Sequence, residues 1–118
     1  MKNDAVGLKR IFKAFEFSIK GLKGCYQSEA AFRQEVWLAS VLIPLALILG
    51  NTSLEKFALI AVVFLVLIVE MLNSAIEAAI DRIGDDYHVL SGAAKDMGSA
   101  AVWLSLVLLV MTWLIILI

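Results

Sequence analysis

Hydrophobic positions in the first part of this 118-residue chain recur with the period of a helix. Between residues 8 and 26 the apolar side chains return every three or four positions, which places them on one stripe of a helix. These apolar residues are Leu8, Ile11, Phe12, Phe15, Ile19, Leu22 and Tyr26, and the polar residues opposite them are Lys9, Lys13, Glu16, Lys20, Lys23 and Gln27. An aromatic and aliphatic face opposite a lysine-rich face is typical of a helix that lies in the membrane interface. A surface helix on a soluble core would show a similar pattern, but the long apolar segments that follow favour the membrane.

The rest of the chain contains three long apolar segments. Val36–Gly50 follows a polar helical start, Phe57–Val69 carries no charge, and Met97–Ile118 is uncharged throughout. A helix needs about 20 predominantly apolar residues to cross a bilayer. We therefore predict an all-α membrane protein that forms a single membrane domain over residues 1–118. Its predicted parts are an amphipathic surface helix over 1–27, spans over 28–50, 54–81 and 95–118, and a cytoplasmic loop over 82–94. Ser28 is the expected N-cap of the first span.

Composition supports the membrane assignment. Hydrophobic residues make up 62% of the chain, compared with roughly 45–50% in soluble domains. A chain this short buries a low fraction of its surface in a water-facing fold. The formal net charge of −1 gives no indication of a nucleic-acid partner. With Cys25 as the only cysteine and His88 as the only histidine, an internal disulfide and a metal site rich in thiols or imidazoles are excluded.

The distribution of lysine and arginine predicts the orientation. The N-terminal 35 residues carry seven of these cations, the connection after the second span carries Arg82 and Lys95, and the turn between the first two spans carries only Lys56. Cytoplasmic loops are enriched in lysine and arginine. We expect the N-terminus and the second connection in the cytoplasm, and the C-terminus on the outer side of the membrane, for a multi-pass membrane protein.

Three polar residues interrupt the second span. Glu70, Asn73 and Glu77 are spaced so that they share one helix face, and Glu77 lies about 10 Å nearer the cytoplasm than Glu70. A carboxylate inside a membrane helix costs about 2.5–3.5 kcal/mol on insertion scales and indicates a functional site. Glu70 is the deeper and less solvated of the two, which suits a general base, whereas Glu77 is closer to water and cations.

Other charged residues are expected at the same border. Glu29, Glu77, Asp81 and Asp96 could supply oxygen ligands to a hard cation, while Lys95 and the basic N-terminal helix could hold phosphate oxygens. This combination favours phosphoryl transfer, although the spacing also suits a cation or proton pathway. Neither GxxxxGK[ST] nor GxGxxG occurs, so a kinase site here would differ in design from soluble nucleotide-binding sites.

Four motifs resemble the prokaryotic diacylglycerol kinase family in sequence, order and spacing. They are Glu29-Ala-Ala-Phe-Arg-Gln-Glu35, Glu70-Met-Leu-Asn-Ser-Ala-Ile-Glu77, Asp81-Arg-Ile-Gly84 and Ala94-Lys-Asp-Met-Gly-Ser-Ala-Ala101. The resemblance covers nearly the whole chain and is closer to the Gram-negative diacylglycerol-specific branch than to the undecaprenol kinases of the same family. It implies ATP- and Mg²⁺-dependent phosphorylation of diacylglycerol to phosphatidic acid, in a homotrimer whose sites are shared between neighbouring subunits. It also implies a bacterial inner membrane, which would place the C-terminus in the periplasm.

The same resemblance implies roles for individual residues. Glu70 matches the general base, and Glu29 and Glu77 match the metal ligands. The positions that match the nucleotide site are Arg10, Phe17, Glu29, Asn73, Glu77, Asp86, Tyr87, His88, Lys95 and Asp96. The positions that match lipid contacts are Arg10, Ala14, Phe15, Ser18, Ile19, Ala31, Glu35, Glu70, Ser99 and Trp113. The chain departs from the family at Phe17, where tyrosine is common, and at Ile19 and Tyr26, where tryptophan is common.

Three other functions compete with a diacylglycerol kinase. An undecaprenol kinase would share the motifs. A small ion-coupled transporter would use Glu70 to bind a proton or a cationic substrate. A non-catalytic membrane subunit would give no purpose to the two glutamates or to the Lys95-Asp96 pair.

Overall fold

The computed structural model describes residues 6–84 and 88–118, and within these residues it contains four helices and no strand. The helices are α1 (Leu8–Ser28), α2 (Ala30–Leu49), α3 (Ser53–Ile83) and α4 (Val89–Leu117). Helices α2, α3 and α4 are each long and apolar enough to cross a membrane. The predicted fold class, three spanning helices preceded by an amphipathic helix, is therefore confirmed.

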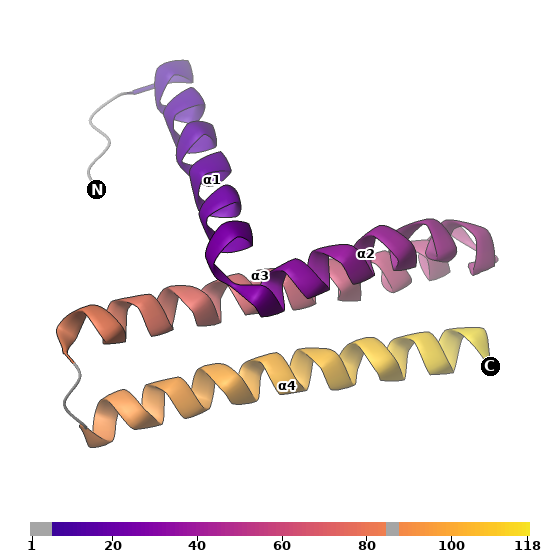
Figure 1. The fold of residues 1–118 in the computed structure, drawn as a ribbon. Helices are drawn as coiled ribbons and strands as arrows, with labels where there is room; N and C mark the ends of the chain where they lie inside the picture. The colour runs from indigo at the N-terminus through magenta and orange to yellow at the C-terminus, as the bar shows by residue number, and fades with distance from the viewer. Residues whose placement is uncertain (1–5, 85–87) are drawn as a thin grey trace.

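The three long helices lie side by side, and α1 projects away from them (Figure 1). Helices α3 and α4 run antiparallel along most of their length, and α2 packs against α3. Because α2 is 20 residues long and α3 is 31, α2 covers only one part of α3. The C-terminal end of α3 extends beyond the start of α2, together with the start of α4 (Figure 1).

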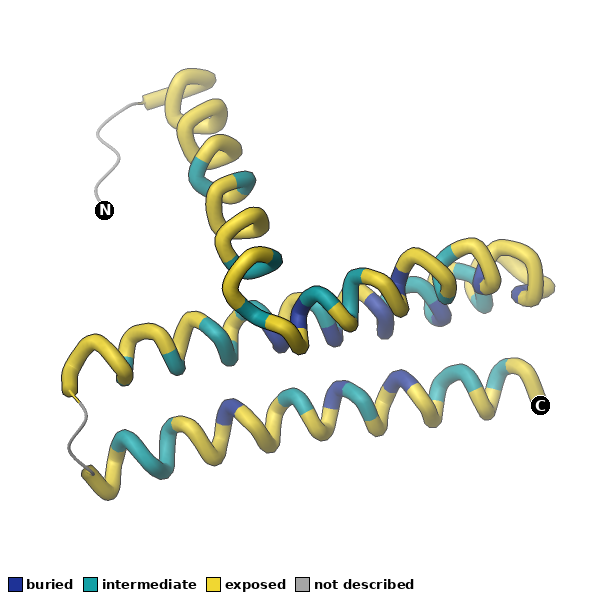
Figure 2. Tube along the Cα trace, in the orientation of Figure 1, coloured by how far each residue is buried: buried dark blue, intermediate teal, exposed yellow. Residues whose placement is uncertain are grey.

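Most of helix α1 has no protein partner, and only its last turns lie against the other helices. None of its residues, all of which the structure describes, is buried, and Figure 2 shows it exposed along almost its whole length. Leu8, Phe12 and Phe15 leave between 64% and 74% of their surface exposed. An apolar stripe without a protein partner is what a helix in the lipid headgroup region presents.

Hydrogen bonds fix the elbow between α1 and α2. Arg33 Nη1 donates to the carbonyl oxygens of Tyr26 at 2.8 Å and Gln27 at 2.9 Å, so that it satisfies two carbonyls at the C-terminal end of α1. Trp37 Nε1 donates to the Tyr26 hydroxyl at 2.9 Å. The expectation that Ser28 caps α2 is wrong: α1 continues through Ser28, whose hydroxyl donates to the Gly24 carbonyl, and Glu29 is the N-cap in an extended conformation.

The core follows one stripe of α3. Leu59, Val62, Val63 and Val66 are buried, and all but Leu59 cluster with Ala39 of α2 and Leu109 of α4. At the far end from Glu70, Trp113 Nε1 donates to the Leu59 carbonyl at 3.1 Å. The same stripe continues at helical spacing to Glu70, Asn73 and Glu77. The face of α3 that packs the apolar core therefore becomes the polar face at the other end.

Both connections between the long helices lead into an N-cap, and the second connection is shorter than the sequence suggests. Thr52 caps α3 by accepting a hydrogen bond from the Glu55 amide at 3.1 Å, while the Glu55 carboxylate accepts one from the Asn51 amide at 3.0 Å. At the other end α3 runs to Ile83, and α4 begins at Val89 rather than at the expected residue 95. His88 caps α4, because its Nδ1 accepts a hydrogen bond from the Leu90 amide at 3.0 Å.

Candidate functional site

Glu70 is a buried carboxylate with an unpaired oxygen. Its side chain retains 7% of its surface exposure, and among the described residues its Oε2 has no hydrogen-bond partner. The Ser74 hydroxyl bonds to the Glu70 backbone carbonyl at 3.0 Å and leaves the carboxylate available. A buried polar atom without a partner carries a desolvation cost, so this oxygen marks a place where a proton, a cation or a substrate hydroxyl would be stabilised.

Three further carboxylates surround Glu70. Glu29 at the elbow, Glu35 on α2 and Glu77 on α3 lie close enough to interact electrostatically with it. All three are partly exposed. The structure therefore brings together acidic residues that the sequence places on three different segments. Like charges in such a group repel one another, and a bound cation would relieve that repulsion.

Asn73 links the acidic group to α4. Its Nδ2 donates to Glu77 Oε1 at 3.3 Å, while its Oδ1 is buried and has no hydrogen-bond partner within the described part of the chain. On its other side lies Gly98, a buried residue of α4. The amide of Asn73 is thus enclosed between two helices and oriented along the Glu77 carboxylate.

The basic component of the site is Lys95. Its Nζ lies 2.8 Å from Asp81 Oδ1, so the pair joins the ends of α3 and α4. Glu77 also lies within electrostatic range of Lys95. Asp96 is exposed on the next position of α4, and His88 stands at the start of that helix. The structure places Lys95 beside the acidic group, as the sequence predicts.

Glu29 and Glu77 have the chemistry of a cation site. Among residues 6–84 and 88–118, no group of three histidine, cysteine, aspartate or glutamate side chains is arranged to hold a metal ion. Mg²⁺ needs less than this, since it takes one or two protein carboxylates and fills its other positions with water and substrate phosphates. Glu29 and Glu77, both partly exposed and both near Glu70, fit that requirement.

The remaining predicted site residues are distributed over α1, α2 and α4. Arg10 and Ala14 line a shallow hollow at the start of α1, and Arg10 is about 22 Å along the helix from Cys25. Phe15, Phe17, Ser18 and Ile19 follow on α1, where the Ser18 hydroxyl donates to the Ala14 carbonyl at 2.9 Å. On the other helices, Ala31 and Ser99 are exposed, and Trp113 lies about 21 Å along α4 from Ser99. Asp86 and Tyr87 lie outside the described residues.

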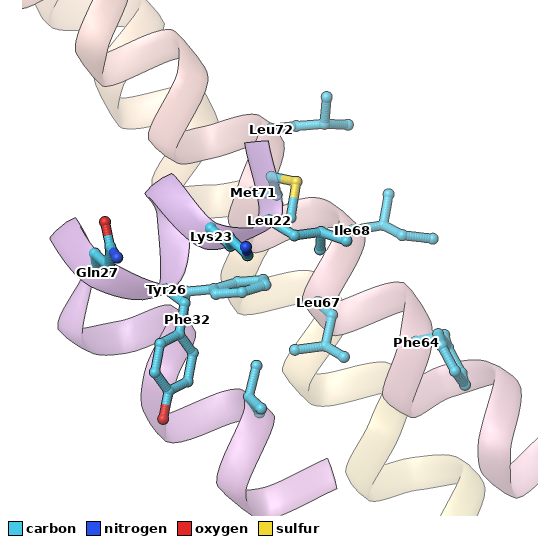
Figure 3. A pocket seen from close by; sticks show the side chains of 11 residues that line it. Leu22, Lys23, Tyr26, Gln27, Phe32, Phe64, Leu67, Ile68, Met71 and Leu72 are labelled. Carbon is cyan, nitrogen blue, oxygen red and sulfur yellow. The ribbon is translucent and has the colours of Figure 1, made fainter. Parts of the chain in front are cut away.

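An apolar hollow opens in the angle between α1, α2 and α3, and its lining was not predicted from the sequence. Its volume is about 600 Å³. Figure 3 shows the side chains that line it, which are Leu22, Lys23, Tyr26, Gln27, Phe32, Val36, Phe64, Leu67, Ile68, Met71 and Leu72. The α3 residues of this lining flank Glu70 in the sequence. The hollow depends on the angle at which α1 leaves α2, and no periodic pattern encodes that angle.

Cys25 and Ser74 also belong to this region, although the sequence analysis gave them no role in it. Burial raises the pKa of the Cys25 thiol, and the neighbouring carboxylates of Glu29 and Glu70 act in the same direction, while a polar contact with the Ser74 hydroxyl opposes them. These interactions place the last turns of α1 against α3 beside Glu70. Ser74 follows Glu70 by four residues, one helical turn. This spacing was the sequence signal that could have placed Ser74 beside Glu70.

Comparisons with known proteins agree with the motifs. A family model described as "Prokaryotic diacylglycerol kinase" matches residues 16–117. A diacylglycerol kinase of Escherichia coli (strain K12) is 50% identical over 117 residues, which cover 99% of this chain and 96% of the relative. A diacylglycerol kinase of Pseudomonas aeruginosa is 50% identical over 107 residues, covering 91% of this chain and 87% of the relative. One from Haemophilus influenzae is 45% identical over 107 residues, covering 91% of each chain.

Proposed function

Since the chain belongs to the prokaryotic diacylglycerol kinase family and is a membrane kinase that uses ATP, we propose that it phosphorylates diacylglycerol to phosphatidic acid at the cytoplasmic membrane face. The observation that carries the proposal is the buried Glu70 carboxylate on a membrane-spanning helix, with further carboxylates and Lys95 at its open end. The phosphate donor is water-soluble and the acceptor is dissolved in lipid. Their reaction requires a site at the border between the two phases.

Glu70 is the proposed general base. In the transfer, the acceptor hydroxyl oxygen forms a bond to the γ-phosphorus, the bond from that phosphorus to the bridging oxygen of ADP breaks, and the hydroxyl proton passes to Glu70. The unpaired Oε2 supports this role, because it is free to accept a proton. Burial also keeps bulk water away from the carboxylate, and this favours phosphorylation of an alcohol over hydrolysis.

Glu29 and Glu77 are the proposed ligands of Mg²⁺. The ion, when bound, neutralises charge on the phosphate oxygens, which is a large part of phosphoryl-transfer catalysis. Glu77 is held by the Asn73 amide, and Glu29 stands at the elbow whose geometry Arg33 fixes. Both residues thus offer oxygen atoms from supported positions.

The remaining nucleotide contacts are assigned to Lys95, Asp96, His88 and the basic residues of α1. Lys95 is the proposed phosphate ligand, supported by its position beside Glu77. Arg10 and Phe17 lie on the projecting part of α1, away from Glu70 of the same subunit. We therefore propose a homotrimer in which neighbouring subunits complete one another's sites. The family resemblance extends the nucleotide assignment to Asp86 and Tyr87.

The acyl chains are assigned to the apolar surfaces around α1. The hollow beside Met71 is lined almost entirely by carbon, and Lys23 and Gln27 contribute polar groups to its lining (Figure 3). Ala14, Phe15, Ser18 and Ile19 lie farther along α1, Ala31 and Glu35 on the first turns of α2, and Ser99 on α4. Trp113 is also assigned to lipid, at the opposite end of the bundle from Ser99.

The cation distribution supports an N-terminus in the cytoplasm and a C-terminus in the periplasm. Of the nine lysines and arginines among the described residues, eight lie on the side that carries Glu29, Lys95 and the N-terminal helix, and Lys56 lies at the other end. With three spans, the two termini then lie on opposite sides of the membrane. This orientation gives cytoplasmic ATP access to the acidic residues.

A substrate comparison tests the proposed function. Purified protein in mixed micelles is incubated with Mg²⁺ and γ-labelled ATP, with dioleoylglycerol or undecaprenol as acceptor, and the lipid products are separated. We expect labelled phosphatidic acid as the main product. Labelled undecaprenyl phosphate without phosphatidic acid would assign the chain to the other lipid specificity of the family. If neither product forms, and Glu70→Gln alters proton-coupled uptake in vesicles, the transporter function replaces the kinase.

A further inference from the structure

Gly98 is the buried residue of α4 that packs against the polar residues of α3. The buried residues of α4 are Gly98, Ser105 and Leu109, which lie on one stripe of the helix because they are spaced by seven and four positions. Leu109 packs in the apolar core. Gly98 lies at the other end of the stripe, opposite Asn73.

The contact between these two residues leaves no room for a side chain. A Cβ atom added to Gly98 would collide with Asn73 Oδ1 and would lie 3.2 Å from Asn73 Cγ. The colliding atom is at the end of a flexible side chain and belongs to no backbone element. An alanine at position 98 would therefore displace the Asn73 amide while the two helices keep their places.

Displacement of the amide would alter Glu77. Asn73 Nδ2 donates to Glu77 Oε1 at 3.3 Å, while its Oδ1 has no other partner in the described chain to hold it. The amide is therefore oriented by the hydrogen bond to Glu77 on one side and by close packing on Gly98 on the other. A Cβ atom at position 98 would push Oδ1 out of this position and turn the amide away from the carboxylate.

We infer that Gly98 is a positioning residue that holds Asn73, and through it Glu77, in the geometry that the nucleotide and its cation require. The inference rests on the proposed function, because it takes the Asn73–Glu77 pair as part of the site. The requirement for glycine at position 98 comes from one side chain, that of Asn73. General helix packing would not depend on what stands at position 73.

The test is a double-mutant cycle between Gly98→Ala and Asn73→Ala. Phosphatidic acid formation is measured together with Mn²⁺-ATP binding by calorimetry, and thermal unfolding in detergent reports on folding. In the otherwise unchanged protein, Gly98→Ala should lower turnover on the order of 10²-fold and weaken Mn²⁺-ATP binding, with thermal stability retained. In the Asn73→Ala background, the same change should have no further effect on either quantity. Gly21→Ala is the matched control, since open space surrounds that glycine, and it should leave turnover and binding unchanged.

The cycle separates this inference from the proposed function. An equal loss from Gly98→Ala in both backgrounds, or no loss in either, would overturn the positioning role. If Gly98→Ala alone prevents folding, the double variant tests the positioning role. A folded double variant with the properties of Asn73→Ala supports that role. A double variant that does not fold contradicts it. If Asn73→Ala and Glu77→Gln themselves leave turnover and Mn²⁺-ATP binding unchanged, the proposed site is wrong and not only the part of Gly98.

Discussion

Lys95 on α4 and Asp81 on α3 form an ion pair with 2.8 Å between Nζ and Oδ1. The pair lies outside the apolar core, on the parts of α3 and α4 that extend beyond α2. It directs the lysine toward α3. Glu77 lies one helical turn before Asp81 and within electrostatic range of the same lysine. The ammonium group is therefore bonded to Asp81 in the electrostatic field of Glu77, and an incoming phosphate would compete with Asp81 for it.

This competition predicts different effects for the two partners. Lys95→Gln should raise the KM for ATP by about tenfold or more, because a charged hydrogen bond to phosphate is lost. Asp81→Asn should lower the KM for ATP by less than about fivefold, since exposed ion pairs contribute little. Steady-state kinetics over a range of ATP concentrations measures both. A larger effect of Asp81→Asn than of Lys95→Gln would mean that Asp81, and not Lys95, contacts the nucleotide complex.

Glu70→Gln should reduce turnover by about 10²–10⁴-fold, which is the usual contribution of a general base. Glutamine keeps the size of the side chain but cannot accept the hydroxyl proton. Nucleotide binding should be nearly unchanged, because the nucleotide contacts are assigned to other residues. Turnover and Mn²⁺-ATP binding are measured on the same preparation.

Glu55→Gln provides the control, since Glu55 lies in the first turn of the same helix at its opposite end. It should retain full turnover. If Glu70→Gln also keeps normal turnover across the pH range, the assignment of Glu70 as general base is wrong.

Glu77→Gln should raise the Mg²⁺ concentration needed for half-maximal turnover by about tenfold or more. Supporting residues of metal sites alone account for 10–100-fold in affinity, and Glu77 is proposed as a direct ligand. Turnover at saturating Mg²⁺ should recover at least in part. A titration with Mg²⁺ at fixed ATP checks this, and an unchanged half-saturating concentration would remove Glu77 from the metal site.

The thiol of Cys25 should react slowly at neutral pH. Burial at the elbow raises its pKa, and the carboxylates of Glu29 and Glu70 act in the same direction. The thiolate is the nucleophile, so a raised pKa moves the alkylation profile to higher pH. Iodoacetamide labelling of the protein in nanodiscs, followed by mass spectrometry, should give a midpoint above that of free glutathione. A midpoint at or below that of glutathione would show that the elbow does not bury Cys25.

Periodicity was sufficient to predict the helices. The apolar runs predict α2, α3 and α4, and the alternation of lysines with aromatic residues predicts α1, because each pattern reflects which solvent a helix face meets. The residues at which the helices begin and end were harder to predict. The sequence does not predict that α4 begins at Val89. The segment from Ser91 to Ala94 consists of small residues, which resemble a polar connection, and the cap comes from His88.

The site was predictable where residues share one helix. Glu70, Asn73 and Glu77 were found by spacing alone, since α3 carries all three on one face. Two features that depend on how the helices pack were not predictable in this way. The packing of Gly98 on Asn73 depends on the register between α3 and α4, and the hollow depends on the angle of α1, which Arg33 fixes through the Tyr26 and Gln27 carbonyls. Both are properties of three-dimensional packing.

The most direct test of the account uses sealed membrane vesicles of both orientations that contain the protein and diacylglycerol. Labelled ATP with Mg²⁺ is supplied only outside the vesicles, and labelled phosphatidic acid is quantified. The account predicts rapid formation in inverted vesicles, whose cytoplasmic face is outside, and almost none in right-side-out vesicles until they are permeabilised. Equal formation in intact vesicles of both orientations, or none in inverted vesicles, would contradict a kinase whose acidic site opens to the cytoplasm.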